Sequence, residues 1–260
     1  MPRILVRRPS PHLADGELTH LSRTPVDPDL ALRQWEGYVS AFAARGWAVT
    51  EVEPADEHPD GVFVEDTVVV FDDVAVLTRP GVASREGEVA STERALDGLG
   101  LTVERITAPG TLDGGDVLKV GRTVHVGRGG RTNDAGIAQL TALLAPRGWT
   151  VVPVPVTTVL HLKSAVTALP DGTVVGFSPG ATALAPDLVV PEEHGTAVVD
   201  LGGDAVVMSA DAPRTAALYR SRGLDVVPVP ISEFEKLEGC VTCLSVRLRQ
   251  EGRAPAPATP

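Results

Sequence analysis

The sequence predicts an α/β fold in which similar units form a ring, like the blades of a propeller. A phrase of glycine, a β-branched run and proline occurs four times, beginning at Gly46, Gly100, Gly148 and Gly223. A helix-like segment precedes each copy, and paired short strands follow at several tens of residues. Self-similarity at this period is typical of propellers, solenoids and arrays.

A helix is expected before each of the four glycines. Asp27 and Pro28 suit an N-cap and the first helical position, and apolar residues then recur at helical spacing as far as Phe42. The same pattern predicts helices over residues 91–99, 132–147 and 211–222. Each following glycine stands where a helix needs a left-handed C-terminal cap, which glycine adopts without steric cost.

The β-branched runs predict strands that end at proline, which cannot donate to a sheet ladder. Strand pairs with turn residues between them are expected over 68–78, 116–127 and 165–177, with a fainter fifth unit over 197–208. The strands at 4–7 and 244–248 are expected to pair and close the ring. A doubly wound parallel sheet is the alternative, but it predicts single strands between helices.

Composition limits the classes of function. The net charge of −11 disfavours non-specific nucleic-acid binding and suits a cationic ligand. Two cysteines in 260 residues do not make a disulfide framework, and the N-terminus is too interrupted for a signal peptide. No apolar run is long enough to span a membrane. We therefore expect a cytoplasmic protein that binds neither nucleic acid nor membranes.

A different reactive motif follows each copy of the phrase. The motifs are Phe63-Val-Glu-Asp66, Asp113-Gly-Gly-Asp116, His161-Leu-Lys-Ser164 and Cys240-Val-Thr-Cys243. Of six histidines, His161 alone occupies the repeat position that corresponds to the cysteines. Matching loops of a ring converge on its axis, so we expect this imidazole beside a thiol, where it can raise the thiolate population or transfer protons.

The Cys-x-x-Cys pair has other interpretations. A cysteine is commonly a small buried apolar residue. A redox couple needs its first cysteine at a helix N-terminus, whereas Cys240 and Cys243 precede a strand-like run. A structural zinc site needs a second ligand pair at short spacing, which the sequence lacks. A nucleophilic thiol beside a histidine remains.

Carboxylates and arginines occupy the neighbouring loops. The acidic residues are Asp60, Glu65, Asp66 and Asp113, and the arginines Arg85 and Arg131 each follow a strand pair. Solvated loop charges and surface ion pairs are the ordinary alternatives, but a shared anion site suits the matching arginine positions. Several carboxylates around a thiolate favour a cation, and a planar guanidinium offers a carbon that the thiolate can attack. The residues alone predict a thiol enzyme acting on a guanidinium.

Six motifs, in order, resemble the dimethylarginine dimethylaminohydrolase family. They are Asp60-Gly-Val-Phe-Val-Glu-Asp66, Thr78-Arg-Pro-Gly81 with Arg85, Leu112-Asp-Gly-Gly-Asp-Val-Leu118, Arg131-Thr-Asn133, Leu160-His-Leu-Lys-Ser164 and Thr242-Cys243. The family belongs to the guanidine-modifying superfamily, the penteins. The resemblance implies a five-bladed α/β-propeller of pseudo-symmetric ββαβ-type units. It implies one catalytic domain over residues 1–249, and a disordered tail is expected over 250–260.

The resemblance also implies the site. Cys243 is the expected nucleophile, His161 the acid and then base, and Asp113 the carboxylate that assists them. Asp60, Glu65 and Asp66 match substrate-pocket residues, Arg85 and Arg131 match arginines that hold the substrate carboxylate, and Leu18 and Leu237 match backbone contacts. The implied reaction hydrolyses Nω-methylated arginine to citrulline and a methylamine.

No cofactor or metal is required, although the resemblance implies that zinc bound to Cys243 and His161 would inhibit. Cys240 is either a bystander or a reversible disulfide partner of Cys243. The expected partner is a small cationic guanidino compound, and the oligomeric state is left open, a homodimer included. Alternatives are an arginine or agmatine deiminase-like hydrolase, a non-catalytic binding member of the same fold, and a Cys-x-x-Cys redox protein.

Overall fold

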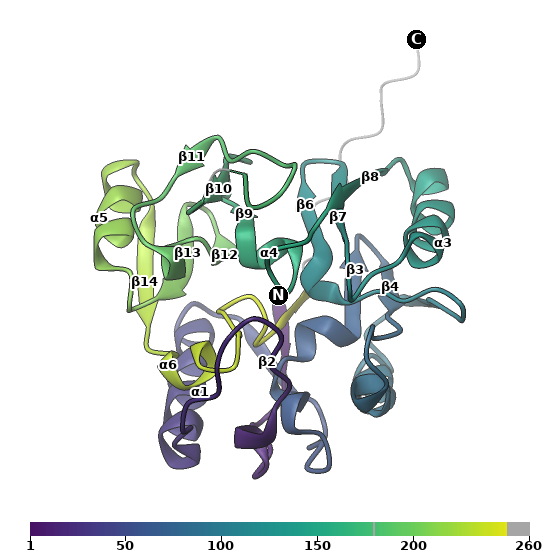
Figure 1. The fold of residues 1–260 in the computed structure, drawn as a ribbon, viewed down its shortest axis with the longest axis horizontal. Coiled ribbons are helices and arrows are strands. Elements are labelled where there is room, and N and C mark those ends of the chain that lie inside the picture. Colours follow the sequence, from purple (N-terminus) through teal and green to yellow (C-terminus); the bar gives the residue numbers. More distant parts are fainter. Residues whose placement is uncertain (179, 249–260) are drawn as a thin grey trace.

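Five three-stranded sheets build the molecule in the computed structural model, which describes residues 1–178 and 180–248. Figure 1 shows the sheets around a common centre, with helices α1 (Pro28–Ala43), α3 (Asp134–Leu144) and α5 (Pro213–Ser221) at the periphery. In each sheet an antiparallel pair is joined by a third, parallel strand. The predicted five-bladed α/β-propeller is confirmed.

Each blade combines a strand that faces the centre of the ring, a middle strand antiparallel to it, and a third strand parallel to the middle one. The blades are β3 (Val68–Phe71), β4 (Val74–Leu77) and β5 (Thr102–Arg105); β6 (Val117–Val120), β7 (Thr123–Arg128) and β8 (Thr150–Pro155); β9 (Val166–Ala168), β10 (Val174–Gly176) and β11 (Leu188–Val189); β12 (Val198–Gly202), β13 (Ala205–Ser209) and β14 (Asp225–Val229); and β15 (Val246–Leu248), β1 (Arg3–Val6) and β2 (Ala48–Glu51). The remaining α-helices are α2 (Val89–Ala95), α4 (Leu162–Ala165) and α6 (Ser232–Glu235).

The repeated phrase forms the junction between a helix and its parallel strand. Gly46, Gly100, Gly148 and Gly223 have φ angles of 77°, 73°, 75° and 91°, the left-handed conformation that was expected. At the start of α1, the Asp27 side chain accepts hydrogen bonds from the backbone N–H groups of Asp29 and Leu30. The repeated phrase therefore belongs to the scaffold of each blade.

The chain termini close the ring. Strand β1 pairs antiparallel with β15, and Arg3 lies opposite Leu248. The expected C-terminal strand began at Leu244, but β15 begins only at Val246, because residues 241–244 form a turn. A hydrogen bond from Cys243 N to Cys240 O, 3.1 Å long, holds that turn.

One blade departs from the expected unit. The described residues between β10 and β11, 177, 178 and 180–187, contain no helix. Gly180 has a φ of 92° and Pro186 stands close to β11, so this segment is unsuited to a helix. The fainter unit expected over 197–208 is confirmed as the pair β12 and β13, with Gly202 and Gly203 at its turn.

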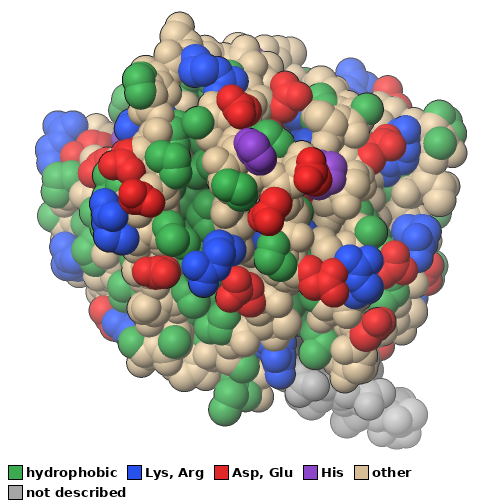
Figure 2. Space-filling model, turned by 90° about the horizontal axis from the view of Figure 1, so that it is seen from below, with side chains coloured by type: hydrophobic (Ala, Val, Ile, Leu, Met, Phe, Trp, Pro, Cys, Tyr) green, Lys and Arg blue, Asp and Glu red, His purple; other side chains and the backbone are tan. Residues whose placement is uncertain are grey.

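Apolar side chains between the sheets and their covering helices form the core. The largest such group brings Trp35, Tyr38 and Phe42 of α1 against Val207 of β13 and Phe234 of α6. None of the helices within the described residues is long and apolar enough to cross a membrane. Figure 2 shows acidic and basic side chains interspersed on one face. The tail expected over 250–260 lies outside the described residues.

Candidate active site

Loops from several blades line one small pocket. Its lining combines the thiol of Cys243 with residues expected from the sequence, namely His161, Asp60, Asp66, Arg85, Arg131 and Leu237. Cys243 reaches it from the turn that precedes β15, and His161 from the residue directly before α4. The ring thus brings together residues from positions 60 to 243, as the repeat predicted.

His161 is buried and held by Asp113. Its Nε2 atom lies 3.0 Å from Oδ2 of Asp113, whose Oδ1 accepts a 2.8 Å hydrogen bond from the backbone of Gly81. Burial by itself lowers the pKa of His161, but the charge of Asp66 and the hydrogen bond to Asp113 outweigh it and raise the pKa to about 9. The imidazole is therefore protonated at neutral pH.

The Gly114-Gly115 turn lets the backbone approach this histidine. A Cβ at Gly115 would lie 2.4 Å from Nδ1 of His161, and one at Gly114 would lie 1.9 Å from the carbonyl oxygen of Glu65. Gly115 N also donates a 2.7 Å hydrogen bond to Oδ1 of Asp66. The two glycines are therefore required by close packing, beyond their usual role in turns.

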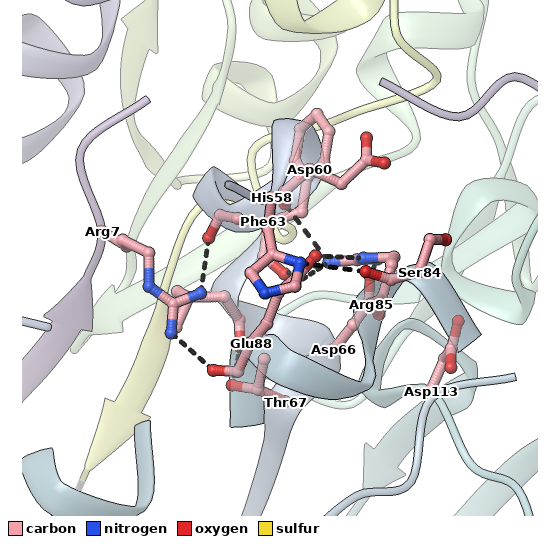
Figure 3. Close-up of polar contacts among 12 residues, drawn as sticks. Arg7, His58, Asp60, Phe63, Asp66, Thr67, Ser84, Arg85, Glu88 and Asp113 are labelled. Carbon is pink, nitrogen blue, oxygen red and sulfur yellow. Dashed lines mark hydrogen bonds and ion pairs between the residues drawn. The ribbon is translucent and has the colours of Figure 1, made fainter. Parts of the chain in front are cut away.

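Asp66 and Arg85 form a buried ion pair beside His161. Nη1 of Arg85 lies 2.7 Å from Oδ2 of Asp66, and its Nε and Nη2 atoms donate to the Glu88 carboxylate at 3.0 and 2.8 Å. Figure 3 shows this cluster, in which Nη2 also donates to the carbonyl oxygens of Asp60 and Phe63. Each nitrogen of the Arg85 guanidinium therefore already donates a hydrogen bond to the protein.

Charge decides the protonation of Asp66. Burial would raise its pKa, but His161 and Arg85 outweigh burial and lower the pKa to about 2. In the same cluster, the carboxylates of Glu88 and Asp66 overcome burial and raise the pKa of Arg85 well above its usual value. Asp66 is therefore a carboxylate and Arg85 a cation throughout the neutral range.

The guanidinium of Arg131 makes fewer hydrogen bonds to the protein than that of Arg85. Its Nη2 atom donates to Oγ1 of Thr19 at 3.3 Å, and its Nη1 atom lies 3.9 Å from Oδ2 of Asp113. The backbone of Arg131 packs against Gly81, where a Cβ would lie 2.4 Å from the carbonyl oxygen of Arg131. This arginine therefore has donors left for an anion in the pocket.

The remaining expected residues fall into two groups. Asp60 lines the pocket, accepts a 3.0 Å hydrogen bond from Glu17 N, and has its pKa raised by burial. Leu18 and Glu65 lie outside the pocket lining: Leu18 packs against the largest apolar cluster of the core, and Glu65 forms an ion pair with Lys163. Burial outweighs Lys163 and raises the pKa of Glu65 to about 7.

The two cysteines form a contact pair. Their Sγ atoms lie 3.4 Å apart, and both thiols are free. The hydrogen bond between the two thiols and the burial of Cys243 raise the pKa of Cys243, and the charges of Glu65 and Asp66 raise it further. The same hydrogen bond lowers the pKa of Cys240 to about 6. Either sulfur can donate the hydrogen bond, so the two thiols share one site at which a negative charge is stabilised.

Three buried side chains offer ligand atoms within 4.8 Å of one another, namely Asp66, Asp113 and His161. This group includes His161 but not Cys243, the two residues at which the family resemblance implies that bound zinc would inhibit. Its carboxylates already accept hydrogen bonds from Arg85, Gly81 and Gly115. Each carboxylate oxygen of Asp66 and Asp113 therefore already has a protein partner.

Comparison with known proteins gives the family. No family model matches the chain. The chain is 59% identical to the N(G),N(G)-dimethylarginine dimethylaminohydrolase of Streptomyces coelicolor, over 95% of this chain and 97% of that protein. It is 34% identical to the enzyme of the same name from Pseudomonas aeruginosa, over 94% and 98%. The chain belongs to the dimethylarginine dimethylaminohydrolase family.

Solved structures agree with this assignment. A cysteine-to-serine variant of the Pseudomonas aeruginosa dimethylarginine dimethylaminohydrolase in complex with citrulline matches with a TM-score of 0.88 and 32% identity, covering 95% of this chain and 98% of that one. A histidine-to-glycine variant bearing an S-methyl-L-thiocitrulline adduct has the same score and identity, and covers 95% and 100%. The arginine dihydrolase domain ArgZ, at 21% identity and a TM-score of 0.83, shows the fold alone.

Two supporting residues of the site, Asp116 and Glu88, are not among those predicted from the sequence. Asp116 accepts hydrogen bonds from Leu162 N at 2.9 Å and from Thr132 Oγ1 at 2.6 Å, and thereby fixes the start of α4 beside His161. Burial, opposed by the charge of His161, raises the pKa of Asp116 to about 6. Glu88 likewise holds Arg85. The only sequence signals were the second Asp of the Asp113 motif and the spacing of three between Arg85 and Glu88.

Proposed function

We propose that this chain hydrolyses Nω-methylated L-arginine to L-citrulline, releasing dimethylamine or methylamine. The observation that carries the proposal is the shared pocket of Cys243 and His161, with the carboxylates of Asp60 and Asp66 in its wall. Family membership at 59% identity supports the same reaction. In this role the chain is a hydrolase of C–N bonds in linear amidines.

The first half of the reaction makes a covalent intermediate. The Cys243 thiolate attacks the guanidinium carbon and forms a C–S bond. The C–N bond to the methylated nitrogen then breaks, and His161 gives that nitrogen its proton, so that a neutral amine leaves. A pKa of about 9 keeps His161 charged and ready to donate at neutral pH.

The second half releases the product. His161, now neutral, removes a proton from water as the water oxygen attacks the same carbon. The C–S bond breaks, citrulline leaves, and Cys243 regains its electron pair. Asp113 supports both steps, because its hydrogen bond to Nε2 orients the ring and stabilises its charged form.

The substrate cation assists the formation of the nucleophile. The hydrogen bond to Cys240 and burial raise the pKa of Cys243 in the ligand-free site, and the charges of Glu65 and Asp66 raise it further. A guanidinium bound against Asp66 would offset that negative potential and favour thiolate on Cys243 over Cys240. The enzyme would thus activate its thiol only when a cation is present.

The amino-acid end of the substrate lies toward the arginines in this proposal. Arg131 has donors that are not used by protein carboxylates, whereas Arg85 is bonded to Asp66 and Glu88. Arg131 therefore contributes the direct contact with the substrate carboxylate, and Arg85 adds charge and holds Asp66 in place. Leu237 flanks this end of the pocket, together with Glu17, the chain neighbour of Leu18.

A substrate panel tests the proposal. Asymmetric dimethylarginine, arginine and agmatine are supplied separately, and the ureido product and released amine are quantified over time. Equal amounts of citrulline and dimethylamine from the methylated substrate are expected. Turnover of arginine or agmatine alone would instead assign a deiminase activity, and no turnover of any of them would indicate a binding protein.

We infer further that residues 1–249 act as one domain. We also infer that the protein works in a reducing, cytoplasmic setting, which is consistent with the two free thiols.

A further inference from the structure

Residues 16–26, which precede α1, contain no helix or strand, and Glu17 of this segment lines the active-site pocket. Most of its side chains are exposed, and Leu18 is among the few that pack on the core. We refer to residues 16–26 as the N-terminal loop. Because apolar burial contributes little here, polar contacts with its backbone decide where it lies.

Glu238 supplies the densest group of these contacts. Its carboxylate accepts hydrogen bonds from three consecutive backbone N–H groups, those of Thr19 at 2.9 Å, His20, and Leu21 at 2.8 Å. Consecutive N–H groups that converge on one anion form a backbone nest. Both oxygens of the carboxylate are used, so a single acceptor atom could not replace it.

The backbone of Glu238 is itself unusual. Gly239 N donates to Phe234 O and Glu238 N to Glu235 O, the pair of bonds that ends a helix in a left-handed residue. That residue is ordinarily glycine, but here it is Glu238, with a φ of 60°. A charged residue in this strained position, directly beside Leu237 and Gly239 of the pocket wall, indicates a role for its side chain.

From these contacts we propose that Glu238 is a positioning residue that latches the N-terminal loop over the active site. The latch connects the segment that leads to Cys243 with Thr19, whose hydroxyl accepts the hydrogen bond from Arg131. Loss of the latch frees the loop and misplaces Arg131 and Glu17 at the amino-acid end of the pocket. The inference rests on the proposed function for its kinetic consequence, but the latch itself is a property of the ligand-free protein.

Two variants separate latching from folding. In Glu238→Gln the side chain keeps its length, but one oxygen becomes an NH₂ group that faces the loop donors. Glu238→Gly removes the carboxylate and relieves the strained φ. Glu36→Gln, at an exposed position of α1, is the control for the loss of one negative charge.

For both Glu238 variants we expect KM for asymmetric dimethylarginine to rise about tenfold with a much smaller change in kcat. Amide hydrogen exchange at residues 19–21, measured without substrate, is expected to accelerate, and the unfolding temperature of Glu238→Gly is expected to stay level or rise. A merely structural role predicts a lower unfolding temperature with KM unchanged, and that result would overturn the proposal. Wild-type exchange at 19–21 in Glu238→Gln would overturn it as well, whether or not the wild-type protein turns over the substrate.

A second inference follows independently from the cysteine pair. The hydrogen bond between Cys243 N and Cys240 O defines a tight turn, in which the first and fourth Cα atoms lie within about 7 Å. That range overlaps the Cα separation of a disulfide, and the Sγ atoms already lie 3.4 Å apart. Cys240 also lines a second, larger pocket, beside His20 and Glu238, through which a small oxidant can reach it.

We infer that Cys240 and Cys243 form a reversible disulfide that switches the nucleophile off. With hydrogen peroxide as oxidant, the Cys240 thiolate attacks one oxygen, the O–O bond breaks, and the sulfur becomes a sulfenic acid as hydroxide leaves and takes up a proton. The Cys243 sulfur then displaces the hydroxyl group, which leaves as water, and the S–S bond forms. The two sulfurs together lose two electrons, and the peroxide is reduced to two molecules of water.

Peptide mass spectrometry without prior reduction tests the switch. After mild peroxide treatment, the peptide that contains both cysteines is expected to lose the mass of two hydrogens, and dithiothreitol is expected to restore both that mass and full activity. The Cys240→Ser variant should instead gain oxygen on Cys243. A gain of oxygen on Cys243 in the unsubstituted protein, with Cys240 still a free thiol, would contradict the switch. The mass change is read without substrate, so it does not depend on the proposed reaction.

Discussion

His161 Nε2 lies 3.0 Å from Asp113 Oδ2, and both side chains are buried, the carboxylate fully. A second carboxylate, Asp66, adds its charge to the same ring. The imidazole is thus held in the form that can donate a proton, although burial alone would favour the neutral form. This relationship leads directly to a pH prediction.

Turnover is expected to fall as pH rises above about 9, because His161 then loses the proton that the leaving amine requires. The fraction of charged His161 is nearly complete well below that pH and declines through it. Asp113→Asn removes a charge that raises the pKa of His161, so the alkaline limb should move to lower pH and kcat should fall about tenfold to a hundredfold. Profiles of kcat/KM against pH for both proteins provide the measurement. Identical alkaline limbs would show that Asp113 does not set this pKa.

The choice of nucleophile is tested with matched serine variants. Cys243→Ser should lower kcat at least about a thousandfold, because the weakly acidic hydroxyl cannot replace the thiolate. Cys240→Ser, assayed with dithiothreitol present, should retain most of the activity. Citrulline formation from asymmetric dimethylarginine is the readout, with circular dichroism as the control for folding. The reverse pattern would make Cys240 the nucleophile.

The two arginines should separate binding from stability. Arg85→Met leaves Asp66 and Glu88 buried without their cation, and we expect a loss of about 3–5 kcal/mol in the free energy of unfolding. Arg131→Met should raise KM severalfold to about a hundredfold with a smaller loss of stability, since Arg131 makes fewer protein contacts. Urea unfolding and steady-state kinetics distinguish the two effects. Equal stability losses would mean that Arg131 is structural too.

Gly115 should tolerate no side chain. In Gly115→Ala the added Cβ meets His161 Nδ1 at 2.4 Å and Asp66 Oδ1 at 3.0 Å, so the ring must move and kcat should fall at least about a hundredfold. Gly37→Ala is the matched control, because an added Cβ on α1 meets nothing within 4 Å. That control should leave kinetics unchanged and stabilise the helix by about 0.5–1 kcal/mol. Full activity in Gly115→Ala would show that the loop can shift without cost to catalysis.

Much of the scaffold could be predicted from local pattern. The four glycines have the left-handed φ that helix ends require, Asp27 caps α1, and β3 and β4 lie within the strand pair expected over 68–78. These features depend on residues within a few positions of one another, so periodicity and capping preferences are sufficient. The blade that contains β10 and β11 was less predictable, since its connection carries no helix within its described residues.

The candidate site was predictable in composition but less so in arrangement. The motifs indicated His161, Cys243, Asp66 and Asp113, and the repeat indicated that their loops converge. The preference for Cys243 over Cys240 needed the family motif, because the two thiols are three residues apart and local pattern treats them alike.

Partners across the ring were decided by tertiary structure alone. Glu65 and Asp66 are adjacent in sequence, yet Glu65 pairs with Lys163, and Asp66 with Arg85 and Gly115. The carboxylate of Glu238 binds backbone more than two hundred positions away. The sequence by itself determined the blade and the residue types available at its loops. Which side chain is charged, saturated or free depends on groups that only ring closure brings within a few ångströms, where burial and Coulomb interactions become strong.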